Sequence, residues 1–392
     1  MKIVLFATTI LEHGGGFEKL IVETAKNLSK FEGNVVDIVT MDNNFTEMIS
    51  LLLTFYYFKK TPRKNLYKES LSGIRQNIGD SRYIKCHTLG DLRKRLSNYD
   101  IIYSKNEILE GVILKFLVGY DNLPPIIFGC HTSIKYPNLR SVHSIIHNFL
   151  YTGLFYKWIA NGVSGFHVTN KFDLNLVKSL FPKKNVRKIY NPFNADLFEF
   201  NLKHFNYDNK WSKNKLNILW IGRLDEQKGV PSLSKVIDII NNNVNYYDKV
   251  VFNILGDGPM RDILFQQEAK WNNVNLFGYV EYKYLPSIYR NNDILISTSS
   301  WEAFGYNVLE AQASGMPVVS FNIPGPQDIV INKKTGFLVA SEEEMVDKVM
   351  LFEKKSVALD SSKNIKSYIS NSFSPSIIYA KMNTMFVEER KK

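Results

Sequence analysis

The chain has 392 residues, 45% of them hydrophobic, and its 49 basic side chains outnumber the 38 acidic ones. This composition is typical of a globular protein, and the length exceeds what one hydrophobic core usually fills, so we expect two domains. The two cysteines form neither a metal-binding spacing nor a disulfide framework, which favours a reducing, cytoplasmic compartment.

The N-terminus predicts a strand, a glycine loop and a helix. Residues 1–6 are short and apolar, and they lack the long apolar core and the cleavage site of a signal peptide. Gly14-Gly-Gly16 follows, and residues 17–28 have apolar positions at helical spacing. Glycines between a strand and a helix let the backbone approach a phosphate closely. The G-x-G-x-x-G dinucleotide pattern is absent from this loop.

An apolar, aromatic segment at residues 48–58 is followed at once by the basic residues 59–64. It is too short to span a bilayer, which takes about 20 apolar residues. Such a segment either lies in a membrane interface or packs inside the domain as an element with a basic cap. Residues 1–195 carry 26 basic and 15 acidic side chains, whereas residues 196–392 carry 23 of each. This asymmetry favours an anionic membrane surface as a partner, since no nucleic-acid motif is recognisable.

His131 stands just past a predicted strand at residues 126–128. A histidine at a strand end is either a structural residue with satisfied hydrogen bonds or part of a site. The other six histidines have no comparable placement: His13, His87, His143, His147, His167 and His204.

Strand-like and helical patterns alternate in both halves, which predicts an α/β protein with two doubly wound parallel sheets. A polar, asparagine- and lysine-rich stretch near residues 201–214 predicts the linker. We therefore place the first domain at 1–198, the linker at 199–212 and the second domain at 213–371. A helical run follows at residues 374–389.

A glycine-bounded loop, Gly222-Arg-Leu-Asp-Glu-Gln-Lys-Gly229, follows the predicted strand at residues 216–221. Arg223 and Lys228 thus come at the carboxyl end of a strand, where open α/β sheets bind ligands. An Arg fork with a Lys point charge suits a diphosphate, although two surface cations would give the same pattern. Leu255-Gly-Asp-Gly-Pro259 follows the next predicted strand and reads mainly as a turn.

Two carboxylates frame a second strand–turn–helix unit, Glu302-Ala-Phe-Gly-Tyr-Asn-Val-Leu-Glu310, after a predicted strand at residues 293–297. The helix N-terminus suits a phosphate, and carboxylates beside it suit sugar hydroxyls. The pattern favours a nucleotide-sugar site. The alternative is a pair of solvated surface carboxylates.

These motifs resemble those of the retaining, GT-B-fold glycosyltransferases of family GT4 (glycosyl transferases group 1). The acidic turn resembles the family's E-x7-E motif, the loop from Gly222 its diphosphate grip, and the Gly14–Gly16 loop its G-G-[AG]-x-[ER] motif. The resemblance implies two Rossmann-like domains facing a cleft, with a C-terminal helix at 372–392 that crosses back to the first. It also implies retaining transfer of a hexose from a nucleotide diphosphate sugar to an acceptor hydroxyl.

The resemblance also assigns roles to single residues. Glu302, His131, Arg223 and Lys228 would be catalytic, with His131 contacting the donor sugar. The donor would contact a larger set: Gly15, Gly16, Arg223, Lys228, Glu302, Phe304, Gly305, Tyr306, Asn307 and Glu310. One motif departs from the family, because Asn191 is followed by a proline where a glycine is usual, which puts contacts from that loop in doubt.

The sequence contains no Asp-x-Asp pair, so we expect no metal and no cofactor, with UDP or GDP carried by the donor. The acceptor would be a glycan, lipid-linked or protein-linked, and the enzyme would be cytoplasmic, either free or peripheral at the inner face of the membrane. Two other functions fit the same scaffold. One is a nucleotide-sugar epimerase or hydrolase, and the other is a non-catalytic carbohydrate- or membrane-binding protein.

Overall fold

A computed structural model describes residues 1–8, 16–41, 78–105, 108–121, 123–136, 142–200, 212, 214–354 and 359–391. The chain divides into two compact units. The first comprises residues 1–190 with the C-terminal residues 375–392, and the second comprises residues 191–374. The second unit thus begins before the boundary expected at residue 198, while the expected limits of the linker and the domains stay predictions.

The first unit is built on a seven-stranded parallel sheet with strand order β3-β2-β1-β4-β5-β6-β7. Its strands are β1 (Lys2–Ala7), β2 (Val35–Met41), β3 (Arg82–Cys86), β4 (Ile101–Lys105), β5 (Ile126–Cys130), β6 (Gly165–Val168) and β7 (Asn185–Lys188). Its helices are α1 (Gly16–Leu28), α4 (Leu89–Leu96), α5 (Ile108–Val112), the π-helical η2 (Ile113–Val118), α6 (Val142–Thr152), α7 (Leu154–Ala160), α8 (Lys171–Leu180) and α17 (Pro375–Arg390).

Both faces of this sheet are buried, as the continuous apolar strands require. Alternate residues of β1 point to opposite faces, so Val4 and Phe6 join one core and Ile3 and Leu5 join the other. The second of these cores includes side chains of α1 and α17, which contact one another. The C-terminal helix is therefore an integral part of the first unit.

The second unit is built on a six-stranded parallel sheet with strand order β10-β9-β8-β11-β12-β13. Its strands are β8 (Leu216–Ile221), β9 (Val250–Leu255), β10 (Val274–Leu276), β11 (Ile294–Ser297), β12 (Val318–Phe321) and β13 (Gly336–Val339). Its helices are α9 (Asp196–Phe200), α10 (Val230–Asn241), α11 (Arg261–Lys270), the 3-10 helix η3 (Tyr282–Tyr284), α12 (Leu285–Arg290), α13 (Tyr306–Ala313), α14 (Pro326–Ile329), α15 (Glu342–Glu353) and α16 (Ser362–Phe373).

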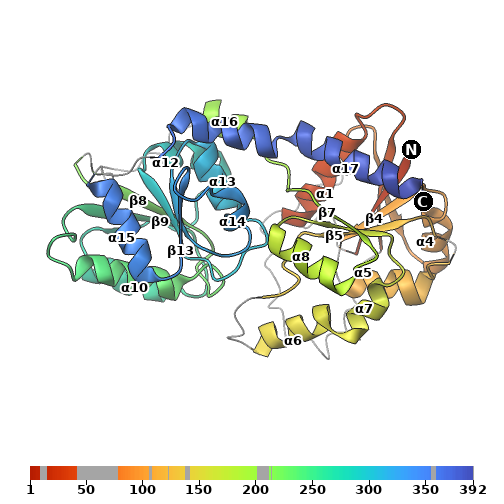
Figure 1. The fold of residues 1–392 in the computed structure, drawn as a ribbon, viewed down its shortest axis with the longest axis horizontal. Coiled ribbons are helices and arrows are strands. Elements are labelled where there is room, and N and C mark those ends of the chain that lie inside the picture. Colours follow the sequence, from red (N-terminus) through yellow and green to blue (C-terminus); the bar gives the residue numbers. More distant parts are fainter. Residues whose placement is uncertain are drawn as a thin grey trace. The chain divides into compact units, whose positions relative to one another are not determined.

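Helices lie on both faces of the second sheet, where α10 contacts α11 and α15, and α13 contacts α16, α14 and α9 (Figure 1). All strand pairs in both sheets are parallel, so the predicted pair of doubly wound α/β sheets is confirmed. In each sheet the strand order reverses beside its first strand, between β1 and β4 and between β8 and β11. Doubly wound sheets bind ligands at the carboxyl ends of such strands.

Candidate donor-sugar site

The two charged motifs of the second half meet at this reversal point. The Gly222–Gly229 loop continues from β8, and the acidic turn continues from β11. These strands are hydrogen-bonded neighbours, with Ile294 opposite Ile218 and Leu295 opposite Leu219. Parallel neighbours end at the same edge of the sheet, so the topology brings together loops that are far apart in the sequence.

The first loop is held by backbone and side-chain hydrogen bonds. The Leu224 amide donates to the Asp257 carbonyl at 3.0 Å. The Asp225 carboxylate accepts from the Lys228 amide at 2.9 Å and forms an ion pair with Arg223. The Arg223 side chain is nevertheless 63% exposed, whereas that of Asp225 is 9% exposed. The loop thus presents a tethered guanidinium to solvent at the edge where ligands bind.

Gly229 ends this loop in the left-handed region, with φ of +73°, and begins α10. A Cβ atom at this position would lie 1.8 Å from the Thr298 carbonyl oxygen, so only glycine fits. The Thr298 hydroxyl accepts from the Trp220 indole at 2.9 Å and donates to the Lys228 carbonyl at 3.0 Å. Close backbone approach and these two bonds fix the two loops against each other.

Lys228 and Glu302 form an ion pair, with Nζ 2.5 Å from the carboxylate Oε1. The Ser299 hydroxyl donates to the same oxygen at 2.9 Å. Both side chains are largely buried, at 24% exposed for Lys228 and 9% for Glu302. The opposite charges of these two side chains attract each other in this partly desolvated position. Both side chains lie at the sheet edge where a charged, polar ligand would be bound.

The helix after the acidic turn, α13, begins at a left-handed glycine, Gly305, with φ of +95°. The Asn307 side-chain amide donates to the Ile221 carbonyl at 3.0 Å, which ties the first turn of α13 to the end of β8. Phe304 is buried, whereas Tyr306 is 42% exposed. The Asn191 side chain hydrogen-bonds to the Tyr306 hydroxyl, so the segment that departs from the family pattern contacts the predicted donor-binding turn.

Glu310 lies on α13 and is 7% exposed. Burial raises the pKa of its carboxyl to about 7, although hydrogen bonds from Tyr289 and Tyr282 and the charge of Lys228 act in the opposite direction. The Tyr289 hydroxyl donates to Oε2 at 2.9 Å. Lys228 therefore contacts Glu302 directly and influences Glu310 through space.

The turn at Leu255-Gly-Asp-Gly-Pro259 has a structural role in this arrangement. A Cβ atom on Gly256 would lie 1.8 Å from the Gly222 carbonyl oxygen, and one on Gly258 would lie 2.5 Å from the Leu224 carbonyl oxygen. These two glycines let the turn after β9 pack backbone to backbone against the loop that carries Arg223.

His131 lies in the first unit, just past the end of β5. Its Nε2 is 2.7 Å from the Tyr103 hydroxyl, which is also 2.7 Å from Nδ1 of His167. Sequence reasoning missed Tyr103 and His167, because neither belongs to a recognisable motif. The expectation that His167 has no placement comparable to that of His131 is wrong, because His167 lies near the carboxyl end of β6 and shares Tyr103 with His131. Of the predicted loop glycines, Gly16 begins α1, and Gly15 lies outside the described residues.

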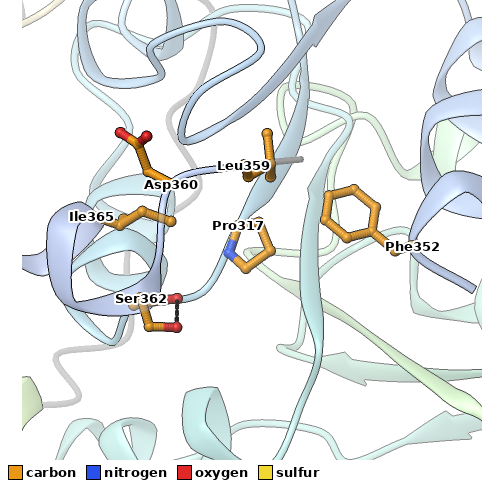
Figure 2. Close-up of a pocket in the computed structure, with 7 residues that line it drawn as sticks. Pro317, Phe352, Leu359, Asp360, Ser362 and Ile365 are labelled. Carbon is orange, nitrogen blue, oxygen red and sulfur yellow. Dashed lines mark hydrogen bonds between the residues drawn. The ribbon is translucent and has the colours of Figure 1, made fainter. Parts of the chain in front are cut away.

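A cavity of about 320 Å³ lies elsewhere in the second unit (Figure 2). It is lined by Gly315, Pro317, Phe352, Leu359, Asp360, Ser362 and Ile365. Gly315 follows the C-terminal end of α13, and Pro317 directly precedes β12. The hydroxyl of Ser362 donates to the Gly315 carbonyl at 2.9 Å, which joins two of the lining residues (Figure 2). This cavity is therefore at the amino end of the strands, opposite the edge that carries the charged loops.

Among the residues that the structure describes, no group of three or more His, Cys, Asp and Glu side chains is placed to hold a metal ion. No helix in the same residues is both long and apolar enough to cross a membrane.

The family model described as Glycosyl transferases group 1 matches residues 204–371, which include both charged loops. An uncharacterized 41.2 kDa protein in the cps region of Klebsiella pneumoniae is 35% identical over 163 residues, covering 41% of this chain and 43% of that protein. An uncharacterized glycosyltransferase of Methanocaldococcus jannaschii is 32% identical over 166 residues, covering 40% of this chain and 42% of that protein. The chain therefore matches less than half the length of these relatives.

Solved structures are similar over nearly the whole chain. Anabaena HepE in complex with UDP has a TM-score of 0.68 at 16% identity, covering 99% of this chain and 100% of that one. Sucrose-phosphate synthase from Thermosynechococcus elongatus has a TM-score of 0.67 at 16% identity, covering 99% of this chain and 98% of that one. These similarities confirm the predicted GT-B fold class with its two Rossmann-like domains.

Proposed function

We propose that the protein is a glycosyltransferase that moves a hexose from a nucleotide diphosphate sugar to an acceptor hydroxyl. The observation that carries the proposal is the meeting of Lys228 and Glu302 at the strand-order reversal of the second sheet. This is the position at which such sheets bind ligands. The family model matched by residues 204–371 supports the same activity.

In the proposed reaction, the Lys228 ammonium and the exposed Arg223 guanidinium bind the diphosphate and stabilise its charge as it departs. The first turn of α13 offers backbone N–H groups and the positive end of a helix dipole to the same group. Glu302 accepts hydrogen bonds from hydroxyls of the hexose, and Glu310 accepts them from the ribose. We keep His131 as the proposed contact to the hexose and propose a retaining outcome, as the resemblance to family GT4 implies.

The ion pair predicts that Glu302 and Glu310 differ in their effects on nucleotide affinity and on transfer. Glu302 neutralises Lys228 through their ion pair, so removing its charge leaves the lysine available to phosphate. We expect Glu302→Ala to bind a nucleoside diphosphate at least as tightly as the wild type while losing transfer. Glu310→Ala should weaken nucleoside diphosphate binding about tenfold or more, because a hydrogen bond to a charged group contributes about 1.5–3 kcal/mol.

Isothermal titration calorimetry with UDP is the first test, since structures of the related fold contain UDP and UDP-glucose. GDP serves as the comparison for the base. An equal loss of affinity in Glu302→Ala and Glu310→Ala would contradict the assigned roles. Nucleotide release from the nucleotide sugar that requires an added acceptor separates a transferase from a hydrolase or epimerase. Binding without any turnover would favour a non-catalytic protein.

We further propose that the acceptor is presented at an anionic membrane surface. The segment at residues 48–64 that first indicated a membrane lies outside the described residues. A different part of the first unit now supports the proposal, namely an exposed aromatic surface on η2, α6 and α7. We define this aromatic surface as Phe116, Leu117, Ile145, Phe149, Leu154, Phe155 and Trp158.

The aromatic surface has the composition of a membrane-interface element. Phe149 is 75% and Leu154 is 85% exposed, and the rings of Phe116 and Trp158 lie 4.5 Å apart. The Lys115 ammonium lies 4.9 Å from the centroid of the Trp158 ring. Residues 122–172 include four basic side chains and no Asp or Glu, so no carboxylate from this stretch opposes an anionic surface. Aromatic rings with neighbouring cations favour the lipid headgroup region.

Vesicle flotation tests this surface. The triple variant Phe149→Ser, Leu154→Ser and Trp158→Ser should lose binding to anionic vesicles, while nucleoside diphosphate affinity stays unchanged. The matched control replaces three exposed apolar residues of the second unit with Ser: Val244, Tyr247 and Tyr279. Wild-type protein that fails to float with anionic vesicles at low salt would leave a soluble glycan or a protein as the acceptor.

A further inference from the structure

His131 is the end of a hydrogen-bonded chain that crosses four strands of the first sheet. Tyr103 on β4 bonds to His131 after β5 and to His167 on β6, each at 2.7 Å. Nε2 of His167 is 2.7 Å from the Ile189 carbonyl oxygen, just past β7. Tyr103 and His167 are almost fully buried, at 5% and 1% exposed. These hydrogen bonds thus lie inside the fold and end at one candidate site residue, His131.

Gly129 makes this series of hydrogen bonds possible. Tyr103 and His167 lie on strands that are separated by β5, and Gly129 is the β5 residue in register with His167. A Cβ atom on Gly129 would lie 2.1 Å from the Tyr103 hydroxyl oxygen. Any larger residue would therefore occupy the space in which the hydroxyl passes over β5 to reach His167.

The hydrogen-bond partners determine where the protons lie. The Ile189 carbonyl can only accept, so Nε2 of His167 carries a proton and donates it. Burial lowers the pKa of His167 to about 4, so its ring is neutral and Nδ1 has a lone pair. Burial also raises the pKa of Tyr103 well above its ordinary value, so the phenol keeps its proton and donates it to that lone pair. The Tyr103 oxygen then accepts from Nε2–H of His131.

We propose that Tyr103 and His167 are positioning residues that fix the ring orientation of His131 and its Nε2–H tautomer. The inference rests on the proposed function in one respect, namely that His131 contacts the donor sugar. In this tautomer Nε2–H is committed to Tyr103, so any hydrogen bond from a sugar hydroxyl would be accepted at Nδ1.

Nitrogen-15 NMR of the histidine-labelled full chain tests the assignment without any substrate. The wild type should show His131 and His167 as single Nε2–H tautomers at neutral pH. Tyr103→Phe keeps the buried ring, which packs against Phe386, and removes the hydroxyl alone. In this variant the Nδ1–H tautomer of His131 should become detectable. A wild-type spectrum with His131 as the Nδ1–H tautomer, or an unchanged spectrum in Tyr103→Phe, would overturn the proposal.

Transfer kinetics provide the second readout. Tyr103→Phe should lower kcat about tenfold or more and leave the Kd for UDP within about twofold, because the nucleotide is assigned to the other unit. His167→Gln can still donate to Ile189 and accept from Tyr103, so it should retain more activity than His167→Leu. Equal losses in the two His167 variants, or full activity in Tyr103→Phe, would count against positioning. If no transferase activity exists at all, the NMR experiment still decides the hydrogen-bond chain.

Discussion

Replacing Glu310 with Gln should stabilise the second unit, and the gain should increase with pH. Gln keeps the size of the side chain and an oxygen that can accept from Tyr289, but it has no charge to bury. Burial raises the pKa of the Glu310 carboxyl from 4.5 to about 7 in the folded chain. A carboxyl whose pKa is higher in the folded chain than in the unfolded chain contributes its full stabilisation at pH values below the unfolded pKa. That contribution is lost as the pH rises through the folded pKa.

The magnitude follows from the size of this shift. Each pKa unit corresponds to about 1.4 kcal/mol, so ionised Glu310 costs the fold about 3 kcal/mol at high pH. At pH 5.5 only part of this cost is present, because the folded side chain is still mostly protonated. Between pH 5.5 and pH 8.5 the advantage of Glu310→Gln over the wild type should therefore grow by about 2 kcal/mol.

Hydrogen exchange of peptides from β11 and α13 is the suitable assay, because it reports the opening of this part of the chain rather than of both units together. Glu226→Gln removes one carboxylate from an exposed position and controls for the change in net charge. A gain in protection that is equal at both pH values, or no gain at pH 8.5, would refute the reasoning from burial.

Three further outcomes are expected. Arg223→Ala and Lys228→Ala should each weaken UDP binding by about 10- to 100-fold in calorimetry, because each removes a charge-assisted contact to the diphosphate, and unchanged affinity in both would remove this loop from the site. Affinity for a nucleotide sugar should rise about tenfold between pH 6 and pH 8, as Glu310 ionises and can accept from the ribose, and Glu310→Gln should abolish this dependence. In urea unfolding, Gly229→Ala should lower the free energy of unfolding by well over the amount that Gly278→Ala lowers it. Both glycines have positive φ, but a Cβ atom meets a carbonyl oxygen at 1.8 Å at Gly229 and nothing within 4 Å at Gly278, where about 1–2 kcal/mol is expected. Similar losses in the two glycine variants would contradict the steric argument.

Much of the fold was predictable because its strands are short apolar runs bounded by glycines and polar turns. The expected strand at residues 216–221 is β8, and that at 126–128 is the beginning of β5. The expected helix at 17–28 matches α1, which begins at Gly16. Local patterns of this kind determine which elements exist and in what order, and the right-handed crossover rule then favours doubly wound sheets.

The site was predictable only as separate motifs. The pairing of Lys228 with Glu302 joins residues 74 positions apart, and it depends on β8 and β11 being neighbours. No local pattern contains that information. The same holds for Tyr103 and His167. Their contact requires that the strand between them has no side chain at Gly129. The assigned roles of the individual site residues stay predictions.

In the ion pair between Lys228 and Glu302, each side chain already has a partner of opposite charge. A ligand must replace both halves at once, with phosphate oxygens for the ammonium and hydroxyl donors for the carboxylate. A nucleotide sugar carries both groups, whereas a nucleoside diphosphate lacks the hexose hydroxyls that are assigned to Glu302. Under the proposed function, re-formation of the pair after sugar transfer would compete with the spent nucleotide for Lys228 and hasten its release. The enzyme would thereby resist inhibition by its own product.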